Sequence, residues 1–265
     1  MKALVTGGSG FLGRKLIAGL KGTATVIDRK AVPGAEFVRG DIRGEVRASG
    51  FDIVYHLAAV SSSRMADKDL DAAWDVNVNG TLNLCRRLGR GQKLVFMSTA
   101  QVYGPSGAAH TEGEQAAPSN FYALTKLVGE DIVRYHSLKN GYSYVIFRLF
   151  NSYSADQPGG LLVGDLMEKF SSGSPTEIYN PESVLDMVHA DDVIAVLCGA
   201  GSIPQGTYNL CSGRGATIRE VYEMVAGHLG KKCGNLKVAS DRKDTLLGDN
   251  SKLRSLGYSF RPLGL

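Results

Sequence analysis

The chain has 265 residues, of which 43% are hydrophobic and 21% are charged. This is ordinary globular composition, and the length suits one α/β domain with a small appended lobe better than two independent domains. The formal net charge of +4 is mild, and the basic residues are scattered along the sequence. Charge therefore gives no support for a nucleic-acid or membrane partner, although it is compatible with an anionic substrate.

The cysteines predict neither a metal site nor a disulfide framework. Four are present, widely spaced and without a C-x-x-C pair: Cys85, Cys198, Cys211 and Cys233. This pattern is typical of buried free thiols. The first residues read as a strand rather than as a leader, and no apolar run reaches about 18 residues. We therefore expect a soluble, cytoplasmic protein that binds no metal.

The chain begins with an expected strand, a glycine-rich loop and a helix in direct succession. Residues 2–5 are an apolar run of strand length, and apolar residues recur at helical spacing over 11–20. Such a loop permits a tight turn, a close approach to a pyrophosphate and close helix packing, while the first helical N–H groups face the phosphates. The loop fits G-x-G-x-x-G with Gly8, Gly10 and Gly13, or G-x-x-G-x-x-G with Gly7, Gly10 and Gly13.

An acidic residue stands where such a loop needs one. Residues 23–27 read as a second strand that ends on Asp28, twenty residues after Gly8. An acid at this point binds the hydroxyls of the adenosine ribose. Asp28 should repel a 2'-phosphate and so favours NAD over NADP, although the adjacent Arg29 can attract that phosphate.

The next two strands add further candidates for cofactor contact. Asp41 follows an expected strand at 36–38, where its carboxylate can reach the adenine amino group. It fits equally well as the N-cap of a helix over 44–48, so both interpretations stay open. A buried strand over 51–59 then ends on Ala58 and Ala59, small residues that would let the backbone lie against a cofactor.

The first half of the chain continues as alternating strands and helices. A polar loop is expected over 61–69, and the helices and strands that follow it are expected over 70–88, 93–97, 120–138 and 144–150. This alternation predicts a parallel, doubly wound sheet. Ligands of such sheets bind outside the carboxyl ends of the strands.

Beyond Asn151 the alternation is less regular. Helices are expected over 159–172, 189–199 and 218–229, the last capped by Thr217, and short strands over 177–179, 207–210 and 236–239. We therefore expect a nucleotide-binding domain over 1–151. Residues 152–265 should form mostly a small substrate-binding lobe, with some segments returning to the first domain.

The main catalytic signal is Tyr122 followed four residues later by Lys126. This spacing places both side chains on one helix face, about one turn apart. Tyrosine, with an ordinary pKa of about 10, is a poor base at neutral pH. A nearby ammonium and a positive nicotinamide ring would favour the phenolate and lower that pKa. Thr99, at the end of the preceding strand, is placed to hold a substrate oxygen.

Two asparagines in the expected helix over 70–88 also need a reason. Asn77 and Asn79 lie in mid-helix, where asparagine is costly. We expect a hydrogen-bonding role for them near the cofactor or near Lys126.

These residues and motifs resemble the extended short-chain dehydrogenases/reductases, and specifically the NAD-dependent epimerase/dehydratase branch that acts on nucleotide sugars. The resemblance implies a Rossmann-type fold and a homodimer formed through the helices over 70–88 and 120–138. The matching segments, spread over nearly the whole chain, are 6–13, Asp28, 40–42, 56–59, 77–81, 98–104, 122–126, 148–151 and 186–192.

The resemblance also implies roles for individual residues. Tyr122 is the expected general base, Lys126 lowers its pKa and holds the nicotinamide ribose, and Thr99 completes the triad and contacts substrate. Asn151 and Arg242 are the expected contacts to the substrate diphosphate. The expected cofactor contacts are Gly7, Gly10, Phe11, Leu12, Gly13, Asp28, Arg29, Asp41, Ile42, Leu57, Ala58, Ala59, Asn79, Tyr122 and Lys126.

Two departures from the family pattern narrow the expected reaction. Members that catalyse 4,6-dehydration carry an Asp-Glu pair after the triad hydroxyl, whereas Ala100 and Gln101 stand here. Leu185 stands where many members have a phosphate-binding arginine, and leucine cannot make a bidentate phosphate contact. The leading hypothesis is a nucleotide-sugar epimerase that recycles bound NAD. The alternatives are an NAD(P)H-dependent reductase of a 4-keto nucleotide sugar or other carbonyl compound, and a dinucleotide-binding regulatory protein without catalysis.

Overall fold

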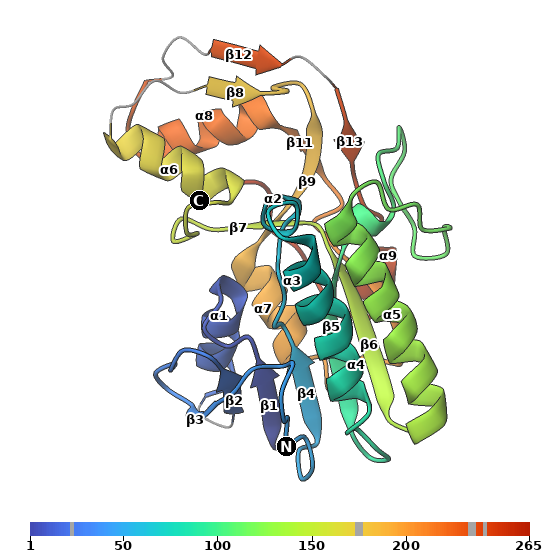
Figure 1. The fold of residues 1–265 in the computed structure, drawn as a ribbon. Helices are drawn as coiled ribbons and strands as arrows, with labels where there is room; N and C mark the ends of the chain where they lie inside the picture. Colours follow the sequence, from blue (N-terminus) through green and yellow to red (C-terminus); the bar gives the residue numbers. More distant parts are fainter. Residues whose placement is uncertain (22–23, 173–176, 233–236, 241–242) are drawn as a thin grey trace. The chain divides into compact units, whose positions relative to one another are not determined.

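The structure, a computed structural model, describes residues 1–21, 24–172, 177–232, 237–240 and 243–265. The chain divides into two compact units. The first unit consists of Met1–Gly104, Gln115–Leu149 and Ile194–Tyr208, and the second of Pro105–Glu114, Phe150–Val193 and Asn209–Leu265. The elements of each unit are labelled in Figure 1.

The first unit is built on a seven-stranded sheet with the order β10-β6-β5-β4-β1-β2-β3. The neighbouring strands from β6 to β3 run parallel, as expected from the alternation of strands and helices. The order reverses between β1 and β4, so the loops after these two strands flank the switch point, where ligands of such sheets bind. The strands are β1 Ala3–Thr6, β2 Ala24–Asp28, β3 Glu36–Arg39, β4 Ile53–His56, β5 Lys93–Thr99, β6 Ser143–Leu149 and β10 Gly206–Leu210.

Helices cover both faces of this sheet, which confirms the doubly wound, Rossmann-type architecture. Its helices are α1 Phe11–Gly19, α2 Ser63–Ala66, α3 Leu70–Trp74, α4 Gly80–Cys85 and α5 Phe121–Asn140, with a π-helical turn η1 at Asp75–Asn79, a 3-10 turn η2 at Ala100–Val102 and the end of α7 Ala190–Cys198. The long α5 begins where the Asn120 side chain accepts a hydrogen bond from the Ala123 N–H. It ends at Gly141, whose φ of 78° no longer continues the helix.

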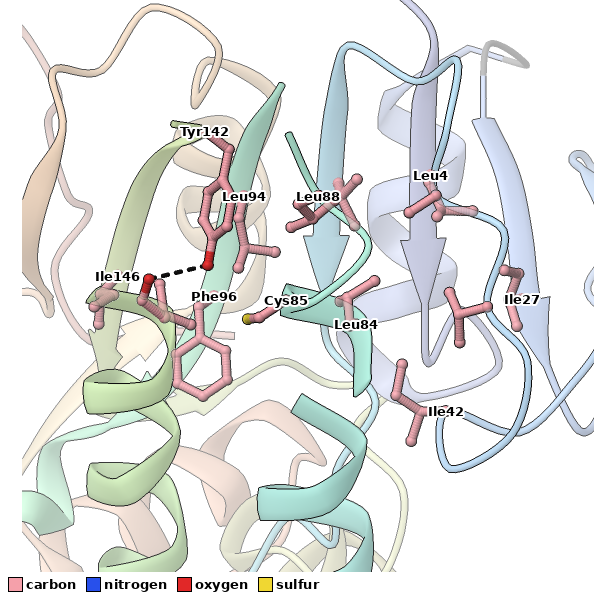
Figure 2. Close-up of a cluster of buried hydrophobic side chains, with 14 residues drawn as sticks. Leu4, Ile27, Ile42, Leu84, Cys85, Leu88, Leu94, Phe96, Tyr142 and Ile146 are labelled. Atoms are coloured by element: carbon pink, nitrogen blue, oxygen red, sulfur yellow. Dashed lines mark hydrogen bonds between the residues drawn. The ribbon is translucent and has the colours of Figure 1, made fainter. Parts of the chain in front are cut away.

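Side chains alternate between the two faces of the sheet, so each face has its own core. On one face, Leu4, Phe96 and Ile146 pack with residues of α4 and α5, as Figure 2 shows. Within this cluster the Tyr142 hydroxyl donates to the Val133 carbonyl over 2.9 Å. On the other face, the hydroxyl of Tyr55 in β4 donates to the carbonyl of Leu197 in α7.

Two local expectations in this unit are wrong, and a third is confirmed with a local irregularity. The residues at 41–50 form turns and no helix, because Val46 and Ala48 are drawn into the core and Gly44 only closes a turn onto the Asp41 carbonyl. The stretch 61–69 is not all loop, since it holds α2, capped by the Ser62 hydroxyl. The helix expected over 70–88 is present as the consecutive segments α3, η1 and α4, which run without interruption to Cys85 and include a π-helical turn at η1. A π-helical turn inside a helix often marks a functional site.

The second unit is a smaller mixture of strands and helices. In its main sheet β9 lies between β11 and β13 and also pairs with β7, while β8 pairs with β12. The bounds are β7 Asn151–Tyr153, α6 Leu162–Ser172, β8 Glu177–Tyr179, β9 Val184–His189, β11 Gly215–Thr217, α8 Ile218–His228, β12 Lys237–Ser240, β13 Thr245–Leu246 and α9 Ser251–Ser255.

Thr217 caps α8 as expected. It forms a reciprocal capping box with Glu220. The aromatic rings of Phe170 and Tyr222 join α6 to α8 in the core of this unit. Across the ranges described above, no helix combines the length and the apolar character needed to cross a membrane.

Candidate active site

The glycine loop, residues 7–13, lies in close contact with the backbone that follows β4. Gly7 comes directly after β1 with a φ of 76°, and a Cβ there would lie 2.5 Å from the Ala58 backbone nitrogen. A Cβ at Gly13 would lie 2.3 Å from the Gly7 carbonyl oxygen. Only glycine allows these two approaches. The helix α1 then opens at Gly10 without a side-chain cap, which leaves the N–H groups of Phe11 and Leu12 available for an anion.

Asp28 ends β2 beside this loop. One oxygen of its carboxylate accepts a hydrogen bond from the Ser9 N–H over 2.8 Å, and the other accepts from the Lys30 N–H over 3.2 Å. The loop glycines and the β2 acid are therefore adjacent, as the sequence predicts. The neighbouring Arg29 side chain is exposed to solvent. After β4, Leu57 is tied to β1 by a hydrogen bond from its N–H to the Thr6 carbonyl.

Asp41 is held by a neighbouring arginine. Both of its carboxylate oxygens accept hydrogen bonds from the Arg43 guanidinium, at 2.8 and 2.9 Å. These side-chain hydrogen bonds lower the pKa of Asp41 to about 2, against an opposing effect of burial. Arg43 also pairs with Asp75 at 3.3 Å. The adjacent Ile42 side chain is buried in the core of the first unit.

The structure brings Thr99, Tyr122 and Lys126 together, each at least nine-tenths buried. The Thr99 hydroxyl oxygen accepts a hydrogen bond from the Gln101 N–H, which leaves the hydroxyl proton free for donation. The Thr99 side chain acts on the Tyr122 hydroxyl in the direction that lowers the pKa of Tyr122. The Lys126 Nζ lies over the ring of Phe96, 4.4 Å from its centroid.

Burial dominates the protonation of both helix residues. It raises the pKa of Tyr122 to about 12, although the Thr99 hydrogen bond opposes this. It lowers the pKa of Lys126 to about 7, against the charge of Glu130, which works upward. In the protein alone the pKa of Tyr122 therefore moves opposite to the expected direction, because desolvation disfavours the phenolate and the ammonium alike.

Sequence reasoning missed the role of His56. Its Nε2 lies 3.0 Å from the Thr81 hydroxyl, and its Nδ1 lies 2.8 Å from the Thr6 hydroxyl. Because Thr81 donates its own proton to the Asn77 carbonyl, it must accept from Nε2–H, and Nδ1 must accept from Thr6. This network requires a neutral ring, and burial lowers the pKa of His56 to about 3.

Asn77 continues the same network to the helix that carries Tyr122. Its amide exchanges hydrogen bonds with the backbone N–H and carbonyl of Val60. It also donates to the Thr125 hydroxyl over 2.9 Å, and Thr125 donates to the Tyr122 carbonyl. Asn79, by contrast, is exposed and bonded to Asp75. The asparagine pair was the correct signal, but the buried member is the one that joins η1 to α5.

The expected diphosphate contacts belong to the second unit or fall outside the described residues. Asn151 begins β7, and its amide donates to the Asp186 carbonyl over 3.3 Å. Leu185 packs against the hydrophobic core of the second unit, as suits its apolar side chain. Arg242 lies outside the described residues, as does Cys233.

The glycine loop and the Tyr122 helix both lie at the carboxyl end of one parallel sheet. This arrangement defines the class of dinucleotide-binding short-chain dehydrogenases/reductases. The sequence profile of the NAD dependent epimerase/dehydratase family matches residues 3–211. The chain belongs to this family.

Relatives and solved structures agree with this assignment. The chain is 31% identical to a UDP-glucose 4-epimerase of Streptomyces lividans, over 84% of this chain and 80% of the relative. It is 26% identical to a GDP-6-deoxy-D-mannose reductase of Pseudomonas aeruginosa, over 85% and 79%. Its structure resembles the Thermus thermophilus UDP-glucose 4-epimerase in complex with NAD, with a TM-score of 0.90, 27% identity and coverage of 100% and 95%.

Proposed function

We propose that the protein epimerises a nucleotide sugar and retains NAD as a bound cofactor through turnover. The observation that carries this proposal is the burial of Thr99, Tyr122 and Lys126 in the first unit, where Thr99 acts on the pKa of Tyr122 and Lys126 follows one helical turn further along α5. The Streptomyces lividans and Thermus thermophilus proteins, which are named as UDP-glucose 4-epimerases, support the reaction class.

The first unit fits a dinucleotide. The turn at Gly7 and the uncapped start of α1 offer backbone N–H groups to a pyrophosphate. Asp28, fixed by the Ser9 N–H, is placed to bind the adenosine ribose hydroxyls and to repel a 2'-phosphate. Further contacts are assigned to Arg29, Asp41 and Ile42 near the adenine, and to Leu57, Ala58, Ala59 and Asn79 along the chain after β4 and η1.

In this reaction Tyr122 removes the proton of a sugar hydroxyl and returns it after the hydride has been delivered to the opposite face of the ketone. Bound NAD supplies the hydride acceptor and, in its oxidised form, a positive charge. Lys126 stabilises the Tyr122 phenolate and holds the nicotinamide ribose. The Thr99 proton, free because its oxygen accepts from Gln101, is donated to Tyr122 or to the substrate oxygen.

The substrate contacts proposed for the second unit are Asn151 and Arg242, which suit a diphosphate. The dehydratase reaction is disfavoured by the residues after Thr99. Ala100 is buried and has no ionisable group, and the Gln101 side chain accepts a hydrogen bond from the Asn120 amide. Neither supplies the acid and base that dehydration requires.

A reductase is the second candidate, favoured by the Pseudomonas aeruginosa relative, which is named as a reductase of a GDP-linked sugar. Such an enzyme would use the same Thr99, Tyr122 and Lys126 and consume NAD(P)H. A regulatory protein without catalysis would not need all three buried together. Asp28 favours the epimerase because it disfavours NADPH.

Analysis of the bound nucleotide tests the proposal. The protein is purified without added ligands and denatured, and the released nucleotide is identified by mass spectrometry. We expect near-stoichiometric NAD or NADH, and interconversion of UDP-glucose and UDP-galactose without added cofactor. An empty protein that NADPH but not NAD stabilises against heating would support the reductase and contradict the epimerase.

We also propose a homodimer formed through α5 and the helical stretch of α3, η1 and α4, the two helices expected over 120–138 and 70–88. Leu124, Tyr135 and Leu138 on α5 are 38, 61 and 87% exposed, a large apolar area for one helix face. Light scattering should give twice the 28.3 kDa of one chain. Leu138→Arg should reduce this mass to that of one chain, whereas Leu256→Arg, a matched exposed leucine in the second unit, should not. A wild-type mass of one chain at micromolar concentration would contradict the dimer.

The cytoplasm is the proposed location. Cys85, Cys198 and Cys211 are free thiols, which suits a reducing compartment. Cell fractionation that recovered the protein outside the cytoplasm would contradict this placement.

A further inference from the structure

The helix α5 carries a third buried ionisable residue on the face of Tyr122 and Lys126. Glu130 follows Lys126 by four residues, so Tyr122, Lys126 and Glu130 succeed one another at intervals of about one turn. All three are buried, and Glu130 is fully so. A carboxylate without solvent must have partners that compensate for its lost hydration.

The partners of Glu130 come from two neighbouring strands and from its own helix. Ser98 in β5 and Arg148 in β6 are paired in the sheet register, so their side chains lie next to each other. Ser98 donates its hydroxyl proton to one carboxylate oxygen over 2.6 Å. Arg148 donates to both oxygens, over 3.0 and 2.8 Å. From α5, Arg134 adds a further contact at 2.6 Å.

Lys126 has no carboxylate of its own in direct contact among the residues described. Its Nζ faces the Phe96 ring, and the adjoining Gly129 allows α5 to lie close to that ring, since a Cβ there would be 2.7 Å from it. From β4, His56 faces Lys126 as a neutral ring. The negative charge that reaches Lys126 is that of Glu130, and it raises the pKa of Lys126 against the effect of burial.

Tyr122 and Lys126 each have one titratable proton. When only one of these two protons is bound, it can be on either residue. Either the proton is on Tyr122 and the lysine is neutral, or it is on Lys126 Nζ and Tyr122 is a phenolate. Burial favours the uncharged arrangement for both groups. A negative charge one turn from Lys126 and two turns from Tyr122 favours the second arrangement, because it attracts the ammonium more than it repels the phenolate.

We propose that Glu130 is a positioning residue that holds the shared proton of this pair on Lys126 Nζ and so leaves Tyr122 able to act as the base. The inference rests on the proposed function of Tyr122. Ser98 and Arg148 keep the Glu130 carboxylate ionised and fixed between the sheet and α5. Glu130 is assigned no contact with substrate or cofactor and acts through Lys126.

Glu130→Gln tests this role, with Asp131→Asn as the matched control. The control removes a carboxylate from the next residue of α5, whose side chain is 72% exposed. The protonation of Lys126 is followed by NMR of isotopically labelled lysine in the protein as purified, with Lys126→Met to assign the signal. In Glu130→Gln we expect the pKa of Lys126 to fall by at least about one unit, a shift that corresponds to a tenfold change in the balance of the two arrangements.

Catalysis supplies the second measurement. The kcat for nucleotide-sugar epimerisation should fall about tenfold in Glu130→Gln across the pH range, in line with the one-unit shift. It should stay within about twofold in Asp131→Asn, where an exposed charge is screened by water. Glu130→Asp, which keeps the charge, should recover most of both readouts.

A double variant keeps the test decisive if Glu130→Gln fails to fold. Glu130→Gln/Arg148→Gln removes both charges of the buried pair and leaves none uncompensated. The inference is overturned if folded Glu130→Gln keeps the pKa of Lys126 and kcat at wild-type values, or if the double variant has the same Lys126 pKa as Arg148→Gln, from which it differs only by the Glu130 charge. If instead wild-type protein epimerises nothing while the Lys126 shift occurs, the proposed function fails and the placement of the proton by Glu130 stands.

Discussion

Glu130 in the first unit and Asp186 in the second are both fully buried carboxylates, but they differ in the groups that hold them. Glu130 accepts hydrogen bonds from two guanidinium groups and a serine hydroxyl. Asp186 accepts only from neutral donors in the described part of the chain, namely the N–H and hydroxyl of Ser212 and the N–H groups of Gly213 and Gly248.

The pKa values of the two acids move in opposite directions. For Glu130, burial works upward, but Arg148, the Ser98 hydrogen bond and the charge of Arg134 together outweigh it and lower the pKa. For Asp186, burial raises the pKa, and its neutral donors only reduce the effect. A buried carboxylate therefore acts as a fixed negative charge when cations hold it. When backbone N–H groups hold it, it serves mainly to fix the loops that supply them.

The largest expected effect is a loss of kcat on replacing Tyr122, the base that Glu130 and Lys126 are proposed to support. Tyr122→Phe removes the proposed base, and kcat should fall by roughly 10²–10⁴-fold while the melting temperature stays close to that of the wild type. Initial rates of nucleotide-sugar epimerisation and thermal unfolding measure the two properties. Asp186→Asn, expected to leave the base intact, is the comparison. A Tyr122→Phe protein that retained a third of wild-type kcat would show that the Glu130 cluster serves no proton transfer at Tyr122.

Removing Glu130 should be the most damaging change to stability. Glu130→Gln leaves Arg148 buried without its counter-ion, which costs about 3–5 kcal/mol in the free energy of unfolding. Urea denaturation measures this cost. The double variant Glu130→Gln/Arg148→Gln should regain part of it, because both charges are then absent. A loss below about 1 kcal/mol in Glu130→Gln would mean that the ion pair is solvated like a surface pair.

Asp186→Asn should cost less. The amide oxygen can still accept hydrogen bonds, but the amide nitrogen would face the donors at Ser212 or Gly248, at a cost of about 1–3 kcal/mol. No buried charge is left without a partner. Urea denaturation under the same conditions gives the comparison, and a loss larger than that of Glu130→Gln would reverse the ranking argued from the donors.

The smallest expected effect is the pH dependence of the free energy of unfolding, which should have opposite signs for Glu130 and Asp186. The pKa of Glu130 lies below its ordinary value of 4.5, so its ionisation stabilises the fold above that pH and the benefit is lost as the pH falls through the folded-state pKa. The pKa of Asp186 lies above its ordinary value of 3.8, so its contribution is full below that pH and is lost as the pH rises through the folded-state pKa.

Acidification from pH 6 to pH 3.5 should therefore narrow the stability gap between the wild type and Glu130→Gln and widen the gap for Asp186→Asn. Each changes by about 1.4 kcal/mol per unit of pKa shift. Urea midpoints across this range measure both gaps. If both stability gaps changed in the same direction on acidification, the opposite pKa shifts of Glu130 and Asp186 would be refuted.

Much of the first unit follows from the sequence, since β1, β4, β5 and β6 contain apolar runs and the loop glycines and Asp28 stand at a fixed spacing. The π-helical turn η1 could not be foreseen, because it accompanies hydrogen bonds of Asn77 to Val60 and Thr125, which lie in other parts of the chain. Likewise, Asp41 could be placed at a strand end, but its pairing with Arg43 is a choice among several charged neighbours.

Part of the charged cluster near Tyr122 could be predicted from the sequence. The four-residue spacing from Tyr122 to Lys126 continues to Glu130, which is the signal that could have revealed it. On the sequence alone such spacing is equally typical of ion pairs on an exposed helix. Burial decides between the two, and it depends on Arg148 arriving from β6. The burial of Tyr122 itself raises its pKa in the protein alone, whereas the expected lowering involves Lys126 and a bound nicotinamide ring and stays a prediction.

The central claim is that a hydride leaves a sugar carbon and returns to it within one bound cofactor. The most direct measurement uses UDP-glucose deuterated at C4, with mass spectrometry and NMR of the epimerised product and no added nucleotide. We expect the product to keep its deuterium at C4 and turnover to need no external NADH or NADPH. A product that has lost the label, or a reaction that proceeds only when reduced cofactor is added, would contradict it.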